Sequence, residues 1–138
     1  MPCALIDANV LVGYIDSDDI LHERAVSALK QARGSLMTTW AAAAEAAYLL
    51  GRRGWEFQEC LLDMIIDEEL LIAPLGREDS PRLKALMSKY RDRPMDLADA
   101  TLLRVAERDG INTILTLDSD FRVYRAAGIG ALKILPKP

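Results

Sequence analysis

The sequence predicts an α/β fold with a mainly parallel central sheet and helices on both of its faces. Short apolar runs, typical of buried strands, alternate along the chain with longer segments of helical periodicity. No linker divides the 138 residues, of which 51% are hydrophobic. We therefore expect a single domain over residues 1–138, large enough to bury roughly 68% of the surface of its unfolded chain.

The first half of the chain is expected to form two strands and four helices. They are a strand at 3–7, helices at 8–15 and 20–32, a strand at 36–38, and helices at 40–53 and 55–67. In the second helix Ala25, Leu29 and Ala32 recur at helical spacing. Thr39 is the expected N-cap of the alanine-rich third helix, and Gly54 stops that helix.

The second half adds three strands and two helices. They are a strand at 70–75, helices at 81–90 and 96–109, and strands at 113–117 and 131–135. Pro81 is a favourable first residue for the helix that it opens, and Pro136 closes the last strand. Strands separated by helices favour a parallel sheet, in which ligands bind beyond the carboxyl ends of the strands.

Cysteine usage and hydropathy limit the class of protein. Cys3 and Cys60 are far apart and lack metal-ligand spacing, so we expect two buried, reduced thiols in a cytoplasmic protein. The apolar runs are much shorter than the roughly 20 residues of a membrane helix, and the N-terminus has no signal-type pattern. We therefore expect no membrane partner.

Four acidic residues lie within or directly after apolar runs, where a charge is costly. Asp7 closes the run 3–6, and Asp118 ends the run 114–117. Glu45 and Asp99 interrupt apolar helical segments. An isolated carboxylate in such surroundings either takes up a proton or needs a cation, so the four together indicate one shared cation site.

The two acids near residue 97 have different expected roles. Asp99 has apolar residues at i+3, i+4 and i+7, so it shares a helix face with residues that must be buried. Asp96 follows Pro94 and is placed to cap the helix through its side-chain oxygen. A supporting role for Asp96 stays open, because residues at i and i+3 lie on the same face.

Structural explanations compete for two of the acids. Glu45 is either a cation ligand or one half of a salt bridge with Arg52 or Arg53. Asp7 is either a ligand or the N-cap of the helix that begins at Ala8. The surrounding apolar run and the separation of more than one helical turn from these arginines favour the ligand role for Glu45, and the presence of the other acids favours it for Asp7.

The formal net charge of −4 is weak evidence against a nucleic-acid partner, because bound cations would neutralise the acidic cluster. Residues 77–93 carry a local net charge of +3, from six basic and three acidic side chains: Arg77, Arg82, Lys84, Lys89, Arg91 and Arg93 against Glu78, Asp79 and Asp92. This segment is either an RNA-facing strip or an ordinary solvated helix and loop.

Four segments together resemble a known family. They are residues 5–11 (LIDANVL), Glu45 within its helix, residues 95–100 (MDLADA) and residues 115–121 (LTLDSDF). In this order and at this spacing they resemble the PIN-domain family, and more narrowly the VapC-type toxin ribonucleases, over essentially the whole chain. The resemblance implies a PIN-like fold, an RNA substrate, a small antitoxin partner and a homodimer.

By the same likeness Asp7, Glu45, Asp99 and Asp118 match the family's acidic quartet, and Asp120 a variable fifth acid. Asn9 and Thr116 match its polar neighbours, which would support the carboxylates through hydrogen bonds, although Asn in a turn and Thr in a strand are also ordinary. His22, the one histidine, is expected on a helix surface.

Carboxylate oxygens without cysteine or histidine ligands favour Mg²⁺ or Mn²⁺ over zinc. One or two such ions would activate a water for in-line attack on a phosphodiester and stabilise the leaving oxygen. The sequence thus predicts a metal-dependent endoribonuclease, the toxin of a type II toxin-antitoxin pair. A PIN-like nuclease that is not a toxin is the alternative.

Other classes fit less well. A haloacid-dehalogenase-like phosphatase has an Asp pair after its first strand, where this chain has Asp7-Ala8-Asn9. A response-regulator receiver domain needs a Lys after a late strand, where residues 118–120 read Asp-Ser-Asp. A non-catalytic, partner-binding PIN-like module would be favoured by a missing acid, and the quartet is complete.

Overall fold

The structure, a computed structural model, describes residues 2–138, and within them five parallel strands form one sheet. The strands are β1 (Cys3–Ile6), β2 (Ser35–Thr38), β3 (Leu71–Ile72), β4 (Thr113–Leu115) and β5 (Lys133–Leu135). Their order across the sheet is β3-β2-β1-β4-β5. The order reverses between β1 and β4, so the carboxyl ends of these two neighbouring strands mark the expected binding edge.

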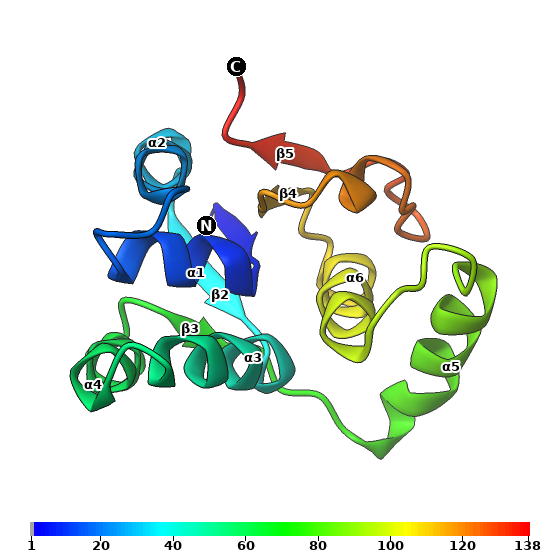
Figure 1. Ribbon diagram of the computed structural model, residues 1–138. Coiled ribbons are helices and arrows are strands. Elements are labelled where there is room, and N and C mark those ends of the chain that lie inside the picture. Colours follow the sequence, from blue (N-terminus) through cyan, green and yellow to red (C-terminus); the bar gives the residue numbers. More distant parts are fainter. Residues whose placement is uncertain (1) are drawn as a thin grey trace.

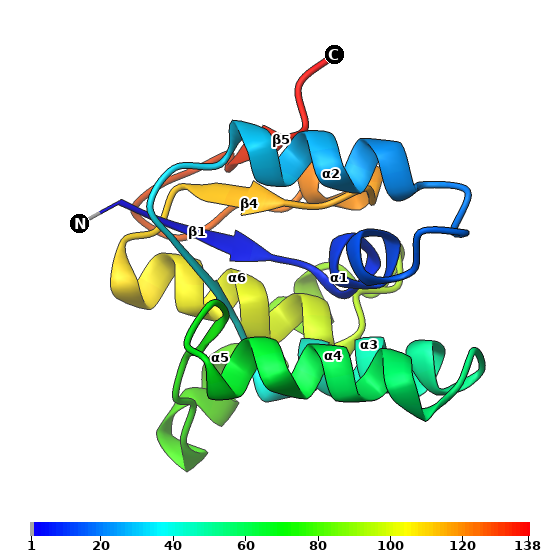
Figure 2. The ribbon, with the colours of Figure 1, turned by 90° about the vertical axis from the view of Figure 1, so that its left-hand side faces the viewer.

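Helices cover both faces of this sheet, as the sequence predicts. They are α1 (Ala8–Ile15), α2 (His22–Gln31), α3 (Trp40–Gly51), α4 (Trp55–Ile66), α5 (Ser80–Lys89) and α6 (Leu97–Asp109), with the 3-10 turns η1 (Arg77–Asp79) and η2 (Ser119–Arg122). In Figure 1, α1, α2 and α4 lie on one side of the strands and α5 and α6 on the other. Figure 2 looks onto the first of these two faces.

Alternation along the strands sends side chains into two apolar cores. Leu5 and Ile114, paired across β1 and β4, face the core beneath α6. Their neighbours Ile6 and Leu115 face the core beneath α1, α2 and α4. All four side chains are fully buried, so both flanking layers are fixed to the two strands that position the candidate site.

Several elements are shorter than the sequence suggests. The strand expected at 70–75 is paired only over Leu71–Ile72, because β3 lies at the sheet edge and Pro74 has no N–H to donate. The strand expected at 113–117 ends at Leu115. The Thr116 amide still donates to the Leu135 carbonyl at 3.0 Å, but the Leu117 and Asp118 amides donate to the side chains of Asn9 and Thr116. The short turn η2 was not expected.

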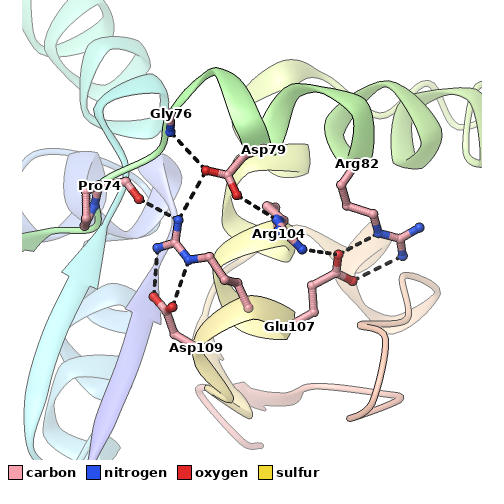
Figure 3. Close-up of polar contacts among 8 residues, drawn as sticks. Pro74, Gly76, Asp79, Arg82, Arg104, Glu107 and Asp109 are labelled. Atoms are coloured by element: carbon pink, nitrogen blue, oxygen red, sulfur yellow. Dashed lines mark hydrogen bonds and ion pairs between the residues drawn. The ribbon is translucent and has the colours of Figure 1, made fainter.

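A buried carboxylate connects the η1–α5 segment to α6 (Figure 3). Asp79 is 1% exposed and accepts hydrogen bonds from the Gly76 amide at 2.9 Å and from Arg104 Nε at 2.9 Å. Arg108 Nη1 adds a third contact at 3.3 Å. The Gly76 hydrogen bond and the two arginines hold the pKa of Asp79 below its usual value. This carboxylate is therefore charged and fixes the arm formed by η1 and α5.

Two members of the basic strip at 77–93 are used in ion pairs. Arg82 Nε lies 2.6 Å from Glu107 Oε1 on α6 (Figure 3), and Arg93 Nη1 lies 3.0 Å from Asp120 Oδ1. The segment is thus partly structural, and its cations do not all face solvent without a partner.

The expectation of two buried thiols is wrong. Cys60 is exposed on α4 and Cys3 is half-buried, and neither forms a disulfide within the described residues. Nowhere in residues 2–138 is there a helix with the length and apolar character needed to cross a membrane.

Candidate active site

Asp7 is the residue that follows β1, and it lies at the centre of the candidate site. Its side chain is 4% exposed, and it caps α1 by accepting the Ala8 amide hydrogen at 2.8 Å. Its second oxygen accepts the hydroxyl hydrogen of Thr116 at 2.8 Å. Burial raises the pKa of Asp7 to about 6, although these two hydrogen bonds act to lower it. The charges of Glu45 and Asp118 raise the pKa slightly further. Asp7 is therefore both a helix cap and a destabilised carboxylate.

Thr116 joins Asp7 to the acid that follows β4. The Asp118 amide donates to Thr116 Oγ1 at 3.0 Å, and the Asp118 carboxylate in turn accepts the Asp120 amide hydrogen at 2.9 Å. Asn9 Oδ1 accepts the Leu117 amide hydrogen at 3.1 Å and so fixes the same segment. The two polar residues expected beside the acids thus contact them or the backbone between them.

The first turn of α6 brings Asp99 to this edge. Asp96 caps the helix as predicted, since its Oδ1 accepts the Asp99 amide hydrogen at 2.8 Å while its side chain stays exposed. Asp99 is 8% exposed. Burial above all, and then the charges of Asp7, Asp96, Asp118 and Glu45, raise the pKa of Asp99 to about 8. The Asp99 carboxyl is therefore largely protonated at neutral pH without a cation.

A residue that the sequence did not indicate also reaches Asp99. The Tyr124 hydroxyl lies 3.4 Å from Asp99 Oδ2, and its ring is fully buried between Tyr90 and Phe121. Burial raises the pKa of Tyr124, so the phenol is a hydrogen-bond donor to the carboxyl. Its spacing from the acids in sequence carries no signal for this contact.

Glu45 lies on the solvent-facing side of α3, and the expectation that it sits in a buried apolar setting is wrong. The run of alanines around it packs on one side of the helix only, with Ala42 and Ala46 buried and Ala44 exposed. Partial burial, and then Asp96 and Asp118, nevertheless raise the pKa of Glu45. The carboxylate therefore belongs electrostatically to the same cluster.

The salt-bridge explanation of Glu45 fails within residues 2–138. Arg52 donates to the Tyr48 hydroxyl at 3.3 Å, and Arg53 pairs with Asp16 at 3.1 Å and with Asp18 at 2.9 Å. Among these described residues no cation lies in ion-pair distance of Glu45. Within the described residues the Glu45 carboxylate is therefore exposed and not held in an ion pair.

Local contacts place the fifth acid, Asp120, and the one histidine, His22. Asp120 is half-buried, and its carboxylate pairs with Arg93. His22 begins α2, half-buried, with Nδ1 2.7 Å from the Gly13 carbonyl oxygen. His22 thus has a structural contact with the end of α1, away from the acids.

The donor set fits a hard divalent cation by its chemistry. Burial raises the pKa values of the Asp7, Asp99 and Glu45 carboxyls, and the neighbouring charge of Asp118 adds to all three increases. Crowded carboxylate oxygens without a compensating positive charge are donors that suit such a cation. In residues 2–138 no three His, Cys, Asp or Glu side chains are arranged so that they could hold an ion as they stand. The acids therefore lie at the same edge of the sheet, but their side chains are not arranged as a complete set of metal ligands.

Comparisons with known proteins agree with this fold. The family model of the PIN domain matches residues 4–127. The chain is similar to ribonuclease VapC26 of Mycobacterium tuberculosis (strain ATCC 25618 / H37Rv), with 26% identity over 134 residues, which are 96% of this chain and 99% of that protein.

Three solved structures have a similar fold. The crystal structure of M. tuberculosis VapC20, described as a sarcin-ricin loop cleaving toxin, has a TM-score of 0.81 at 18% identity, covering 94% of this chain and 98% of that one. A toxin-antitoxin complex from Klebsiella pneumoniae has a TM-score of 0.66 at 22% identity, covering 96% and 95%. VapBC2 from Rickettsia felis, bound to a promoter DNA fragment, has a TM-score of 0.64 at 15% identity, covering 96% of each chain.

The matched segment extends over most of the chain and contains every acid of the quartet. This chain belongs to the PIN-domain family.

Proposed function

We propose that this protein is a divalent-metal-dependent endoribonuclease and the toxin of a type II toxin-antitoxin pair. The main observation behind this proposal is that Asp7, Asp99 and Asp118 lie at the edge of the sheet where the strand order reverses between β1 and β4. The pKa values of the Asp7 and Asp99 carboxyls are raised there. The similarity to a protein named a ribonuclease, along nearly the full length of both chains, supports RNA as the substrate. Perturbed carboxyls at such an edge are typical of catalytic centres.

Asp7, Asp99 and Asp118 would hold the cation, Mg²⁺ or Mn²⁺, with Glu45 completing the set from α3. When bound, such an ion makes a water nucleophilic near neutral pH and offsets charge on the phosphodiester oxygens. The protein's own contribution is orientation. Thr116 holds Asp7 Oδ2 and the Asp118 amide, and the Asp96 cap fixes the turn that presents Asp99.

Proton storage is the second contribution of these residues. Without a cation, the Asp99 carboxyl holds a proton at neutral pH and accepts a hydrogen bond from Tyr124 at Oδ2. This proton limits repulsion among the acids of the empty cluster. We therefore expect cation binding to displace it.

Partners follow from the same proposal. The solved relatives include toxin-antitoxin complexes, so we propose a small antitoxin that covers the acidic edge, and a homodimer of this chain. The cytoplasm is the proposed location, since RNA is found there and the two free cysteines suit a reducing compartment. A short neighbouring reading frame encoding a DNA-binding protein would separate a toxin from a PIN-domain nuclease with another role.

Cleavage of single-stranded RNA by the purified protein tests the activity. We expect cleavage with Mn²⁺ and none with EDTA. Asp99→Asn should be inactive, because an amide is a poorer cation ligand, whereas Asp96→Asn should stay active, because Asn caps a helix about as well as Asp. Equal loss in both variants would show that Asp96 acts at the metal as well.

A further inference from the structure

A basic surface borders the acidic site, and it is built from two segments that are about 30 residues apart in the sequence. We call residues 89–93 and 120–125 the basic rim. The Tyr90 and Tyr124 rings meet edge to face at 4.9 Å, and the Arg125 amide donates to the Tyr90 hydroxyl at 2.9 Å. The Arg93–Asp120 ion pair closes the junction. In Figure 1 the loop after α5 and the loop after β4 accordingly lie side by side.

The rim concentrates positive charge in an acidic protein. Its five basic side chains are all exposed: Lys89, Arg91, Arg93, Arg122 and Arg125. Against them stand two acids, Asp92 and Asp120, of which Asp120 is already paired with Arg93. The rim thus carries +3, and since the whole chain carries −4, the remainder carries −7.

The rim is continuous with the acidic site. The Asp120 amide donates to the Asp118 carboxylate at 2.9 Å, and the Tyr124 hydroxyl lies 3.4 Å from Asp99. A nucleic-acid strand whose phosphates contact the rim would therefore lie next to these acids.

On its other side the rim continues into a shallow pocket of about 360 Å³ beside Arg122. Arg24 from α2 and Lys137 from the C-terminal end also line this pocket, together with Ser27, Pro136 and Pro138. Among the described residues that line the pocket there are three cations and no acid, which favours an anionic occupant.

We infer that the basic rim binds the phosphate backbone of the single-stranded RNA whose scissile bond enters the acidic site. This inference rests on the proposed function and names the surface that holds its substrate. An acidic centre alone repels a polyanion, so a neighbouring row of cations is needed to bring a phosphate to it. Exposed guanidinium groups with free N–H donors suit phosphate oxygens, and a row of them suits a repeating backbone.

Arg91 and Arg122 are the most informative positions to change. Within residues 2–138 the Arg91 side chain donates only to the Ser88 carbonyl, and the Arg122 side chain forms no hydrogen bond or ion pair. Arg125 is unsuitable for substitution because its Nη1 donates to the carbonyls of residues 122–124. Arg93 is unsuitable because it forms the ion pair with Asp120. Arg33→Gln is the matched control, because it removes the same charge from an exposed site at the opposite end of the sheet.

The test measures binding rather than cleavage. A fluorescently labelled single-stranded RNA oligonucleotide is titrated with the Asp99→Asn protein in EDTA, at several KCl concentrations. The slope of log Kd against log salt should fall by about 0.7 in Arg91→Gln and again in Arg122→Gln, since each phosphate contact to a single strand contributes about that much. Arg33→Gln should keep the slope of the parent protein.

The possible results separate this inference from the function on which it rests. If the binding slopes change as expected but the wild-type protein never cuts RNA in the presence of Mn²⁺, the nuclease is refuted and the rim stands. Equal slopes in both rim variants and in Arg33→Gln would overturn the rim. Unchanged RNA binding combined with a changed molecular mass in light scattering would overturn it too, and would assign the surface to a second copy of this chain.

Discussion

Removing the charge at Asp99 should abolish a pH-dependent loss of stability in the metal-free protein. Burial and neighbouring acids raise the pKa of Asp99 from 3.8 to about 8, so the folded chain holds a proton that the unfolded chain releases near pH 4. The stabilisation from this proton is complete below the unfolded pKa and is lost as the pH rises through the folded pKa. The free energy of unfolding should therefore fall between about pH 4 and about pH 8.

The size of the effect follows from the width of this window. Each proton held by the folded state alone changes the unfolding free energy by about 1.4 kcal/mol per pH unit. Between about pH 5 and about pH 8, Asp99 then accounts for roughly 3 to 4 kcal/mol, and Asp7, with a pKa of about 6, adds about 1 kcal/mol near the start of the range. A loss of this size is a large part of the stability of a small domain.

Urea unfolding in EDTA at about pH 5, 6.5 and 8 provides the assay. Asp99→Asn should flatten most of the decline and should be more stable than the wild type at the highest pH. Asp63→Asn, an exposed acid on α4, is the control and should show the wild-type decline. A wild-type unfolding free energy that is constant or rises from pH 5 to pH 8 would refute the crowded-carboxylate explanation.

Three further outcomes are expected. Glu45→Gln should weaken Mn²⁺ binding and RNA cleavage but change the unfolding free energy by less than about 1 kcal/mol, because the side chain is exposed; a loss of 3 kcal/mol or more would restore its salt-bridge role. Asp79→Asn should cost about 3 kcal/mol in urea unfolding, because Arg104 and Arg108 lose a buried carboxylate, and wild-type stability would contradict this. Mn²⁺ at a hundredfold its Kd should stabilise the wild type by about 2.7 kcal/mol, and an unchanged thermal midpoint would speak against binding.

Local rules were sufficient for part of the site. Asp7 and Asp118 were selected as candidates because each follows a short apolar strand, and Asp99 because apolar residues share its helix face, and their role as ligands stays a prediction. The cap at Asp96 follows from the chemistry of a helix N-terminus and is confirmed. These signals depend on neighbours within about one or two helical turns, so the sequence carries them directly.

Contacts between distant segments could not be predicted in the same way. Alanine tolerates both core and solvent, so the alanine-rich α3 gave no reliable periodicity, and Glu45 was wrongly placed in a buried setting. The Arg93–Asp120 ion pair and the Tyr124–Asp99 hydrogen bond arise from docking of the loops after α5 and β4, which no local pattern encodes. The sequence also does not show that β1 and β4 are neighbours, and Asp7 and Asp118 lie close together only because the strand order makes them so.

Calorimetric titration of Mn²⁺ at about pH 7, in buffers of different ionisation enthalpy, tests the central claim most directly. Because the Asp99 carboxyl is largely protonated at this pH and a ligand must be ionised, binding should release close to one proton, and Asp99→Asn should lose both the affinity and the release. Mn²⁺ binding without proton release, equally strong in Asp99→Asn, would place the cation elsewhere and contradict the assignment of these acids as its site.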